Sequence, residues 1–498
     1  MAKHGFSLAL ISLVVVLGPA TMHAAANDAD RLNVLFLAVD DLRPELGCYG
    51  NQRVKSPHID RLAKRGVAFG RAYCQQAVCS PSRTSLLTGL RPDATKVYDL
   101  ETHFRDTVPD VVTLPQHFKN HGYHAVGMGK IFHGGLNDEL SWSEPWRRPN
   151  AGGYQLRENQ EMIQKKHAEA KQRGLNGKRL SRAARGPATE MADVPDNAYP
   201  DGACADMAIE TLRRVKDKPF FLAAGFLKPH LPFNAPKKYW DLYQRDEIRL
   251  ADNPFAPKGA PPFALTDFGE LRNYDDMPPS GPVSEEDSRR LIHGYLACVS
   301  YTDAQIGRVL DELDRLDLTE KTAIVLWGDH GWKLGEHGSW CKHTNFELDA
   351  RAPMIFAAPG IQDAGQPTDA LAEFVDIYPT LCDLAKLPLP GHLQGTSLVP
   401  VLGNVRKSVK SAAFSQYPRS HEGRGLMGYS MRTDRWRYTE WIDRKTGEVV
   451  ARELYDHVND PAENENAAEK TDNQAVVKEL STQLAKGEGW REAQRGNY

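Results

Sequence analysis

Three stretches of the sequence, residues 33–39, 219–226 and 321–327, are apolar over most of their length. A strand of this composition is buried on both faces, which is typical of the central strands of a parallel sheet. The first stretch ends at Asp40 and Asp41, and charged residues and histidines also follow the other two. Because open α/β sheets place ligands at the carboxyl ends of their strands, we expect a functional site where these three strands end.

Segments with helical periodicity separate the predicted strands, for example residues 300–316 before the third one. This alternation predicts a large α/β domain with helices on both faces of its sheet, which we assign to residues 27–390. Two long polar segments interrupt the pattern. Residues 150–195 predict a partly helical surface segment, and the Pro-rich residues 250–285 predict an ordered loop near the mouth of the site.

The pattern changes after residue 390. Residues 428–441 alternate in the manner of a strand, residues 443–447 predict a turn, and residues 449–455 predict the returning partner strand. A polar helix is expected from about residue 471 to residue 490. We therefore expect residues 391–498 to form a small antiparallel C-terminal subdomain.

The amino-terminal residues predict export. Lys3 and His4 precede an apolar stretch from Phe6 to Leu17, and a cluster of small residues ends at Ala26. This order is typical of a cleavable signal peptide, here residues 1–26, and predicts a secreted or periplasmic protein. The rest of the chain has no apolar run of the roughly 18 residues that a membrane helix requires, so we expect no membrane span after cleavage. The lack of an Asn-x-Ser/Thr sequon favours a bacterial source.

Composition narrows the possible partners. The 498 residues carry a formal net charge of -3, so the molecule has no global positive field for a polyanion. We expect no nucleic-acid partner, and any other polyanion would have to meet a local basic site. The seven cysteines form no CxxC pair and have no zinc spacing. Their odd number in an oxidising compartment raises the question of whether one of them is neither a thiol nor half of a disulfide.

The strongest local motif is Cys79-Ser80-Pro81-Ser82-Arg83, followed by Thr88-Gly89. It resembles the signature of the type I sulfatase family, in which the cysteine is oxidised to Cα-formylglycine after synthesis. Further matches cover nearly the whole mature chain, and several of them, such as residues 40–44 and 415–419, are similar to the iduronate-2-sulfatase group. The resemblance implies an alkaline-phosphatase-like fold, with a large mixed or parallel sheet flanked by helices. It also implies a partner for maturation, a formylglycine-generating or anaerobic sulfatase-maturating enzyme.

A metal site is expected at the strand ends. Asp40, Asp41 and Asp329 offer hard carboxylate oxygens of the kind that Ca²⁺ prefers, and His330 is a less usual neighbour. The resemblance adds position 79, whose hydrated aldehyde would contact the same ion. We expect one Ca²⁺ in the site, with the imidazole as its one soft neighbour.

The chemistry that the resemblance implies follows from the charge of a sulfate ester. Its oxygens repel nucleophiles, so a site must neutralise that charge and supply a strong nucleophile. In the family pattern a hydroxyl of the hydrated aldehyde at position 79 attacks sulfur, and the second hydroxyl then expels sulfate and restores the aldehyde. Arg83, Lys130 and Lys342 would hold the hydrate and the sulfate oxygens.

Two histidines complete the set that the resemblance implies. His133 would be the base that deprotonates the sulfated hemiacetal, and His230 the acid that protonates the departing sugar oxygen. Trp332 and His343 follow two of the catalytic positions and could either face the substrate or pack.

The preferred hypothesis is a secreted sulfatase that acts on a sulfated oligosaccharide or polysaccharide. A phosphate or phosphonate monoesterase of the same superfamily is the first alternative, although its typical Ser or Thr nucleophile and two zinc ions do not match Cys79, Lys130 and Lys342. The second alternative is a non-catalytic protein that binds sulfated glycans and keeps Cys79 as a thiol. The sequence leaves open which sugar is recognised and whether action is at a chain end or internal.

Overall fold

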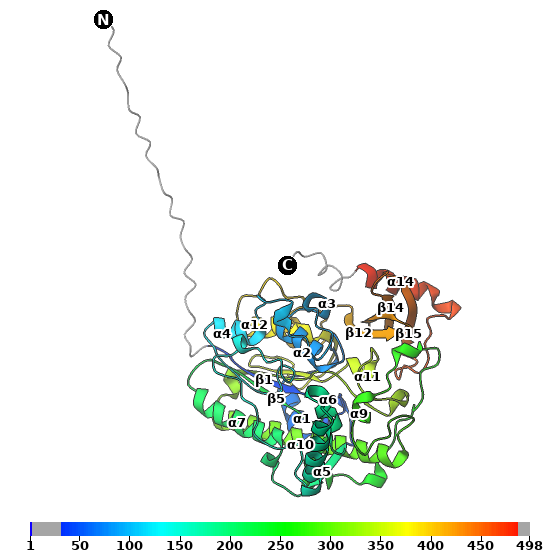
Figure 1. Cartoon of the computed structure of the whole chain (residues 1–498). Coiled ribbons are helices and arrows are strands. Elements are labelled where there is room, and N and C mark those ends of the chain that lie inside the picture. The colour runs from blue at the N-terminus through cyan, green and yellow to red at the C-terminus, as the bar shows by residue number, and fades with distance from the viewer. Residues whose placement is uncertain (2–30, 487–498) are drawn as a thin grey trace.

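The computed structural model describes residue 1 and residues 31–486 of the chain (Figure 1). Apart from its first residue, the predicted signal peptide 1–26 lies outside the described part. Among the described residues, no helix has both the length and the apolar character needed to cross a membrane. The chain builds one large sheet of seven strands and a smaller sheet of four strands.

The seven-stranded sheet is mixed, with the strand order β11-β2-β10-β7-β1-β5-β3. Strands β3, β5, β1 and β7 run parallel, whereas β10 is antiparallel to both of its neighbours and β11 is parallel to β2. The bounds are β1 Asn33–Val39, β2 Val67–Tyr73, β3 His124–Gly129, β5 Phe220–Phe226, β7 Thr322–Gly328, β10 Met354–Ala357 and β11 Thr368–Glu373. The three predicted central strands are β1, β5 and β7, which lie side by side and are buried along their whole length.

Each face of this sheet has its own apolar core. Successive side chains of a strand point to opposite faces, so Leu35 and Leu37 of β1 enter one core while Phe36 and Ala38 enter the other. The first core is completed by α1 (Pro57–Lys64), α7 (Pro200–Val215) and α10 (Glu285–Arg315), and the second by α2 (Cys79–Thr88), α4 (Leu114–Asn120) and α12 (Ile377–Leu384). Figure 1 shows the two helix groups on opposite sides of the sheet. The predicted α/β layering is confirmed.

Helix α10 is longer than predicted. The expected helix 300–316 in fact begins at Glu285, because the apolar spacing continues upstream through Leu291 and Tyr295. The Ser284 side chain accepts a hydrogen bond from the backbone N–H of Asp287, and the first turn carries three acidic residues. Both features stabilise a helix N-terminus.

The smaller sheet is an antiparallel meander of β12 (Ala413–His421), β13 (Arg424–Arg432), β14 (Trp436–Asp443) and β15 (Val449–Asp456). Helix α14 (Gln474–Lys486) packs on it through Leu480 and Leu484. The predicted hairpin between β14 and β15 is confirmed. The prediction of one strand over residues 428–441 is wrong, because a turn at residues 433–435 divides it into two paired strands.

The two polar segments are ordered and contain short elements of their own. Residues 150–195 contain α5 (Arg157–Gln172) and α6 (Gly177–Ala183), and then β4 (Thr189–Ala192), which pairs with β6 (Phe233–Pro236). Residues 250–285 form a long ordered loop that contains α9 (Gly269–Arg272). The remaining short α-helices and strands are α3 Pro92–Thr95, α8 Lys237–Trp240, α11 Glu347–Ala350, α13 Val399–Leu402, β8 Lys333–Leu334 and β9 Trp340–Cys341.

Candidate active site

The parallel register of β1 and β7 brings their acidic ends together. Val39 pairs with Gly328, so Asp40 and Asp41 leave β1 beside Asp329, which follows β7. Asp41 has a positive φ of 59° and its backbone N–H donates to Asp329 Oδ1 at 3.0 Å. All three carboxylates are fully buried. Burial of three acids at one place requires cations close by, because unpaired buried charge is costly.

Helix α2 presents Cys79 and Arg83 to these carboxylates. The two residues are four apart and therefore lie on the same face of the helix. Arg83 Nε donates to Asp329 Oδ2 at 2.9 Å and Nη2 donates to Asp40 Oδ1 at 3.0 Å, while Nη1 donates to the carbonyls of Lys130 and Ile131. The Ser82 hydroxyl donates to the Asp329 carbonyl. Arg83 thus ties the ends of β1, β3 and β7 to α2, a positioning role that the sequence did not predict.

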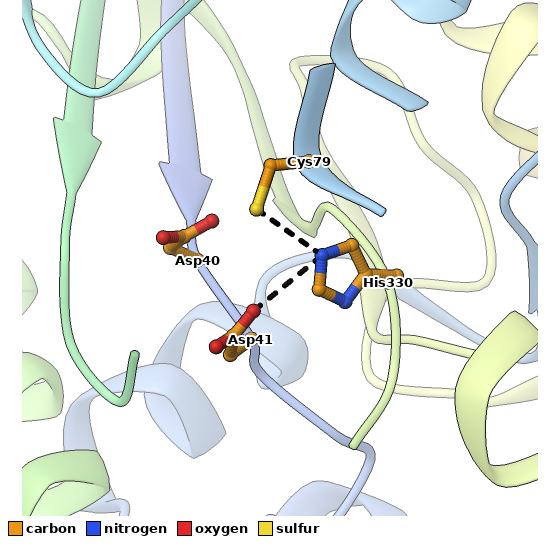
Figure 2. A group of neighbouring side chains, drawn as sticks. All are labelled: Asp40, Asp41, Cys79 and His330. Carbon is orange, nitrogen blue, oxygen red and sulfur yellow. Dashed lines mark hydrogen bonds and ion pairs between the residues drawn. The ribbon is translucent and has the colours of Figure 1, made fainter. Parts of the chain in front are cut away.

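Four of the five predicted metal ligands converge on one point. Figure 2 shows Asp40, Asp41, Cys79 and His330, whose ligand atoms all lie within 4.8 Å of one another. His330 Nε2 is 3.4 Å from Asp41 Oδ1 and 3.5 Å from Cys79 Sγ. Asp329 lies beside this group, with Oδ1 3.5 Å from His330 Nε2. A buried set of carboxylate oxygens with one imidazole fits a divalent cation, and oxygen is the donor that Ca²⁺ prefers.

Two lysines each pair with one of these carboxylates. Lys130, just after β3, donates to Asp40 Oδ2 and lies 3.6 Å from Cys79 Sγ. Lys342, just after β9, donates to both oxygens of Asp41 at 3.0 and 3.1 Å. Burial alone would lower the pKa of Lys342, but Asp41 raises it well above its usual value. Both predicted lysines therefore belong to the cluster as cations.

The two predicted histidines also border the cluster. The pKa of His133 falls to about 3 because of burial and the charge of Lys130, and its Nδ1 has no hydrogen-bond partner among the described residues. His230 Nε2 lies 3.9 Å from Asp41 Oδ2. Burial, followed by Lys130 and Lys342, lowers the pKa of His230, and Asp40 opposes this shift. His133 is therefore neutral and able to accept a proton, whereas a hydrogen bond to Glu270 joins Asp40 in opposing the lowered pKa of His230.

Comparisons with known proteins identify the family of the chain. A family model described as "Sulfatase" matches residues 32–387, and one described as "N-sulphoglucosamine sulphohydrolase, C-terminal" matches residues 335–489. The chain is 37% identical to iduronate 2-sulfatase of Mus musculus, over 93% of this chain and 95% of that protein. The chain belongs to the sulfatase family. It is a sulfuric ester hydrolase.

Solved structures share the fold of this chain. A protein crystallised with its substrate D-glucosamine-2-N,6-O-disulfate superposes with a TM-score of 0.73 at 23% identity, covering 94% of this chain and 99% of that chain. A phosphonate monoester hydrolase from Silicibacter pomeroyi gives a TM-score of 0.70 at 22% identity, covering 92% of this chain and 95% of that chain. The resemblance to an alkaline-phosphatase-like sulfatase fold is thereby confirmed, and the fold alone does not separate sulfate from phosphonate chemistry.

One residue of the sulfatase site was not predicted from the sequence. Glu270 of α9 accepts a hydrogen bond from Lys342 Nζ at 3.0 Å, and its Oε1 lies 3.2 Å from His230 Nε2. His343 Nε2 is 3.7 Å from the other oxygen. Glu270 stands alone in a polar loop with no adjacent motif, so only its place in the predicted mouth loop could have indicated it. Trp332 is buried and carries Lys342 Nζ 4.7 Å above its ring, a packing role.

The first two acids of the sulfatase site differ in proton affinity. Burial opposes ionisation of Asp40, but Lys130, His230 and Arg83 together hold its pKa well below the usual range. Burial raises the pKa of Asp41 to about 7, and Lys342 offsets this only in part. A cation bound between the two carboxylates would favour their ionised forms. The donor set therefore has the chemistry of a site that is completed by a metal.

Proposed function

We propose that this sulfatase removes sulfate esters from a sulfated saccharide in the manner of iduronate 2-sulfatase, with residue 79 as a formylglycine. The observation that carries the proposal is the position of Cys79. Cys79 is the first residue of α2, and its side chain is buried. Its Sγ lies close to Lys130 and His330 and beside Asp40 and Asp41. A nucleophile at that position would have the ammonium group of Lys130 close by. Such a cation stabilises the negative charge on the oxygens of a sulfate group.

The residues that would hold a metal are Asp40, Asp41, Asp329, His330 and residue 79, and the oxygen-rich set favours Ca²⁺. When bound, such a cation would supply positive charge to the nucleophile and the sulfate group. Arg83 keeps two of the carboxylates in place through its guanidinium. The negative charge and the oxygen donors of the three buried carboxylates support this assignment.

An aldehyde at position 79, once hydrated by water, would supply one hydroxyl as the nucleophile toward sulfur and a second hydroxyl whose loss of a proton would release sulfate and restore the aldehyde. Lys130 and Lys342 neutralise the sulfate oxygens. His133, neutral at physiological pH, accepts the proton of the second hydroxyl. His230 protonates the departing sugar oxygen, and the incoming sulfate provides the negative charge that favours its protonated form.

The substrate class follows from the named relatives. The match to iduronate 2-sulfatase extends over nearly the full length of both chains, which supports a sulfated sugar of a glycan as substrate. We further propose export through a signal peptide at residues 1–26, maturation by a formylglycine-generating or anaerobic sulfatase-maturating enzyme, and a division into a catalytic domain 27–390 and a C-terminal subdomain 391–498. The family match to residues 335–489 begins before the proposed division.

The test combines a mass measurement with an assay. Protein is produced with and without a maturating enzyme, and the mass of the tryptic peptide of residues 72–83 is measured by mass spectrometry. A mass lowered by the conversion of thiol to aldehyde, with hydrolysis of an aryl sulfate that depends on it, is expected. Cys79→Ala should fold and lose turnover. Unchanged turnover in Cys79→Ala, or preference for an aryl phosphate, would contradict the proposal, and an unmodified inactive protein that binds sulfated glycan would favour a binding function.

A further inference from the structure

Residues 157–185, which contain α5 and α6, are the most basic part of the described chain near the site. They hold nine Lys or Arg against three Glu and no Asp, a net charge of +6 in a protein whose formal net charge is -3. The rest of the molecule is therefore acidic as a whole. A local concentration of this size creates a positive potential that the overall charge conceals.

Most of these cations face solvent. We call residues 157–185 the α5–α6 hairpin. Among the described residues, five exposed side chains of this hairpin form no ion pair with a carboxylate: Lys165, Lys171, Arg173, Arg179 and Arg182. Only one buried residue, Ala170, lies within the two helices. These five form no ion pair that would hold the hairpin in place, so their charge is available to solvent or to an anionic ligand. Their charged groups are exposed to solvent.

The hairpin is anchored on one side to the loop that carries Glu270. Arg185 lies over the ring of Tyr274 at 4.7 Å, Lys166 pairs with Asp275, and the backbone N–H of Asp275 donates to the Gly186 carbonyl at 3.1 Å. Tyr274 is four residues beyond Glu270, which contacts Lys342 and His230 in the site. The base of the hairpin thus adjoins the wall of the active site.

The other end of the hairpin contacts a segment that leads to His133. Lys178 of α6 pairs with Glu101. Three residues later, the ring of Phe104 stacks on Phe132 with the centroids 5.8 Å apart, and Phe132 immediately precedes His133. The basic hairpin therefore connects the Glu270 side of the site with the His133 side. A polymeric ligand that extends from the site along this border would pass the unpaired cations.

We propose that the α5–α6 hairpin is a binding surface for the remainder of a sulfated polysaccharide whose reacting sugar occupies the active site. This inference rests on the proposed function and deepens it by making a polymer, rather than a small sulfate ester, the preferred substrate. A polymer with many sulfate groups carries condensed counterions. When Lys and Arg side chains of a protein neutralise the sulfates, these counterions are released, as they are from nucleic acids. Arginine forks match the oxyanion geometry of sulfate, and three of the five unpaired cations are arginines.

The test compares two variants that lose equal charge. The first is the triple variant Arg173→Gln, Arg179→Gln and Arg182→Gln on the hairpin. The control is Lys216→Gln, Lys218→Gln and Lys321→Gln. These lysines are also exposed and unpaired among the described residues, but they precede β5 and β7 at the opposite end of the sheet. The proteins are full-length and matured, the binding probe is heparin at 0.15 M salt, and hyaluronan serves as a sulfate-free polyanion.

The hairpin variant should bind heparin about tenfold or more weakly than the wild type, with a shallower dependence on salt, while the control binds as the wild type does. Its kcat/KM for a small aryl sulfate should be unchanged, because none of the three arginines touches the site. Equal loss in both variants, no loss in either, or equal binding of hyaluronan and heparin by the wild type would overturn the inference. Failure of the wild type to hydrolyse any sulfate ester would instead overturn the proposed function, whatever the binding result.

Discussion

At the scale of residues, the site buries equal numbers of acids and bases at the strand ends: Asp40, Asp41, Asp329, Arg83, Lys130 and Lys342. Their formal charges cancel, which is why so many ionised groups can share a dry space. A divalent cation would give the cluster an excess of two positive charges, and Glu270 would reduce this excess to one. A sulfate ester with a single negative charge then matches the site, so affinity and catalysis both depend on each lysine.

Lys130 provides the first test of this balance. Replacing Lys130 by Met keeps the apolar stem and removes the charge that lies 3.6 Å from the reacting position. We expect kcat to fall roughly 10²- to 10³-fold, the usual cost of losing one preorganised donor to a developing negative charge. Burial lowers the pKa of Lys130, but Asp40 more than reverses this, so the loss should be the same at pH 6 and pH 9.

The measurement is steady-state hydrolysis of an aryl sulfate across that pH range, with the degree of Cys79 conversion determined for each preparation. Circular dichroism and thermal unfolding show whether the variant folds. A decrease of less than tenfold in a folded, fully converted variant would show that Lys130 does not stabilise the transition state.

At the scale of elements, the sequence predicts what is encoded in continuous patterns. Strands β1, β5 and β7 are apolar throughout, and the residues that follow them meet because parallel strands end at one edge. The acidic ligands and His330 follow such strands directly, whereas Lys130 and Lys342 are indicated only by the resemblance to the sulfatase family. Glu270 could not be found in this way, since α9 has only four residues and reaches the site through the course of a long loop. Likewise, the turn at residues 433–435 has no Gly or Pro to mark it.

The loop that carries α9 places a competing anion in the site. The carboxylate of Glu270 contacts Lys342 and His230, the two groups that we assign to the sulfate and the leaving oxygen. Replacing Glu270 by Gln should leave Lys342 more available to anions. Inorganic sulfate, the reaction product, should then inhibit at about a tenfold lower concentration, which corresponds to the loss of one charged contact.

Asp267→Asn is the matched control for this loop. Asp267 is exposed three residues away, and its replacement removes the same charge without touching Lys342. Inhibition constants for sulfate are measured in competition with an aryl sulfate for both variants. If Glu270→Gln and Asp267→Asn have the same inhibition constant, Glu270 does not compete for the sulfate site.

At the scale of the whole molecule, a buried ion network joins the two sheets. Glu347 of α11 accepts a hydrogen bond from Tyr73 of β2 at 3.0 Å and forms an ion pair with Arg437 of β14. Arg437 Nε also pairs with Glu463 at 2.7 Å, and the backbone N–H of Glu347 donates to Glu463 at 2.7 Å. Lys342 is only five residues before Glu347, so the smaller sheet supports a segment of the active site.

Replacing Arg437 by Ala should therefore destabilise the protein. Arg437 is the shared cation of two buried carboxylates, and its removal leaves both without their main partner. Breaking a buried pair in this way costs about 3 to 5 kcal/mol of the free energy of unfolding. Arg435→Ala is the control, because Arg435 lies two residues away on the same hairpin and pairs with Asp456 at the exposed surface. It should change stability little, as exposed pairs do.

The pH dependence decides whether the cost is electrostatic. Burial opposes ionisation of Glu463, but Arg437 and His457 hold its pKa at about 2, below the ordinary value of 4.5. A carboxyl with a depressed native pKa stabilises the fold above its unfolded pKa, and this contribution disappears as the pH falls through the native value. In denaturant unfolding, the difference between wild type and Arg437→Ala should thus be full at pH 7 and shrink between about pH 4.5 and pH 2. A difference that does not change with pH would mean that Arg437 acts through packing alone.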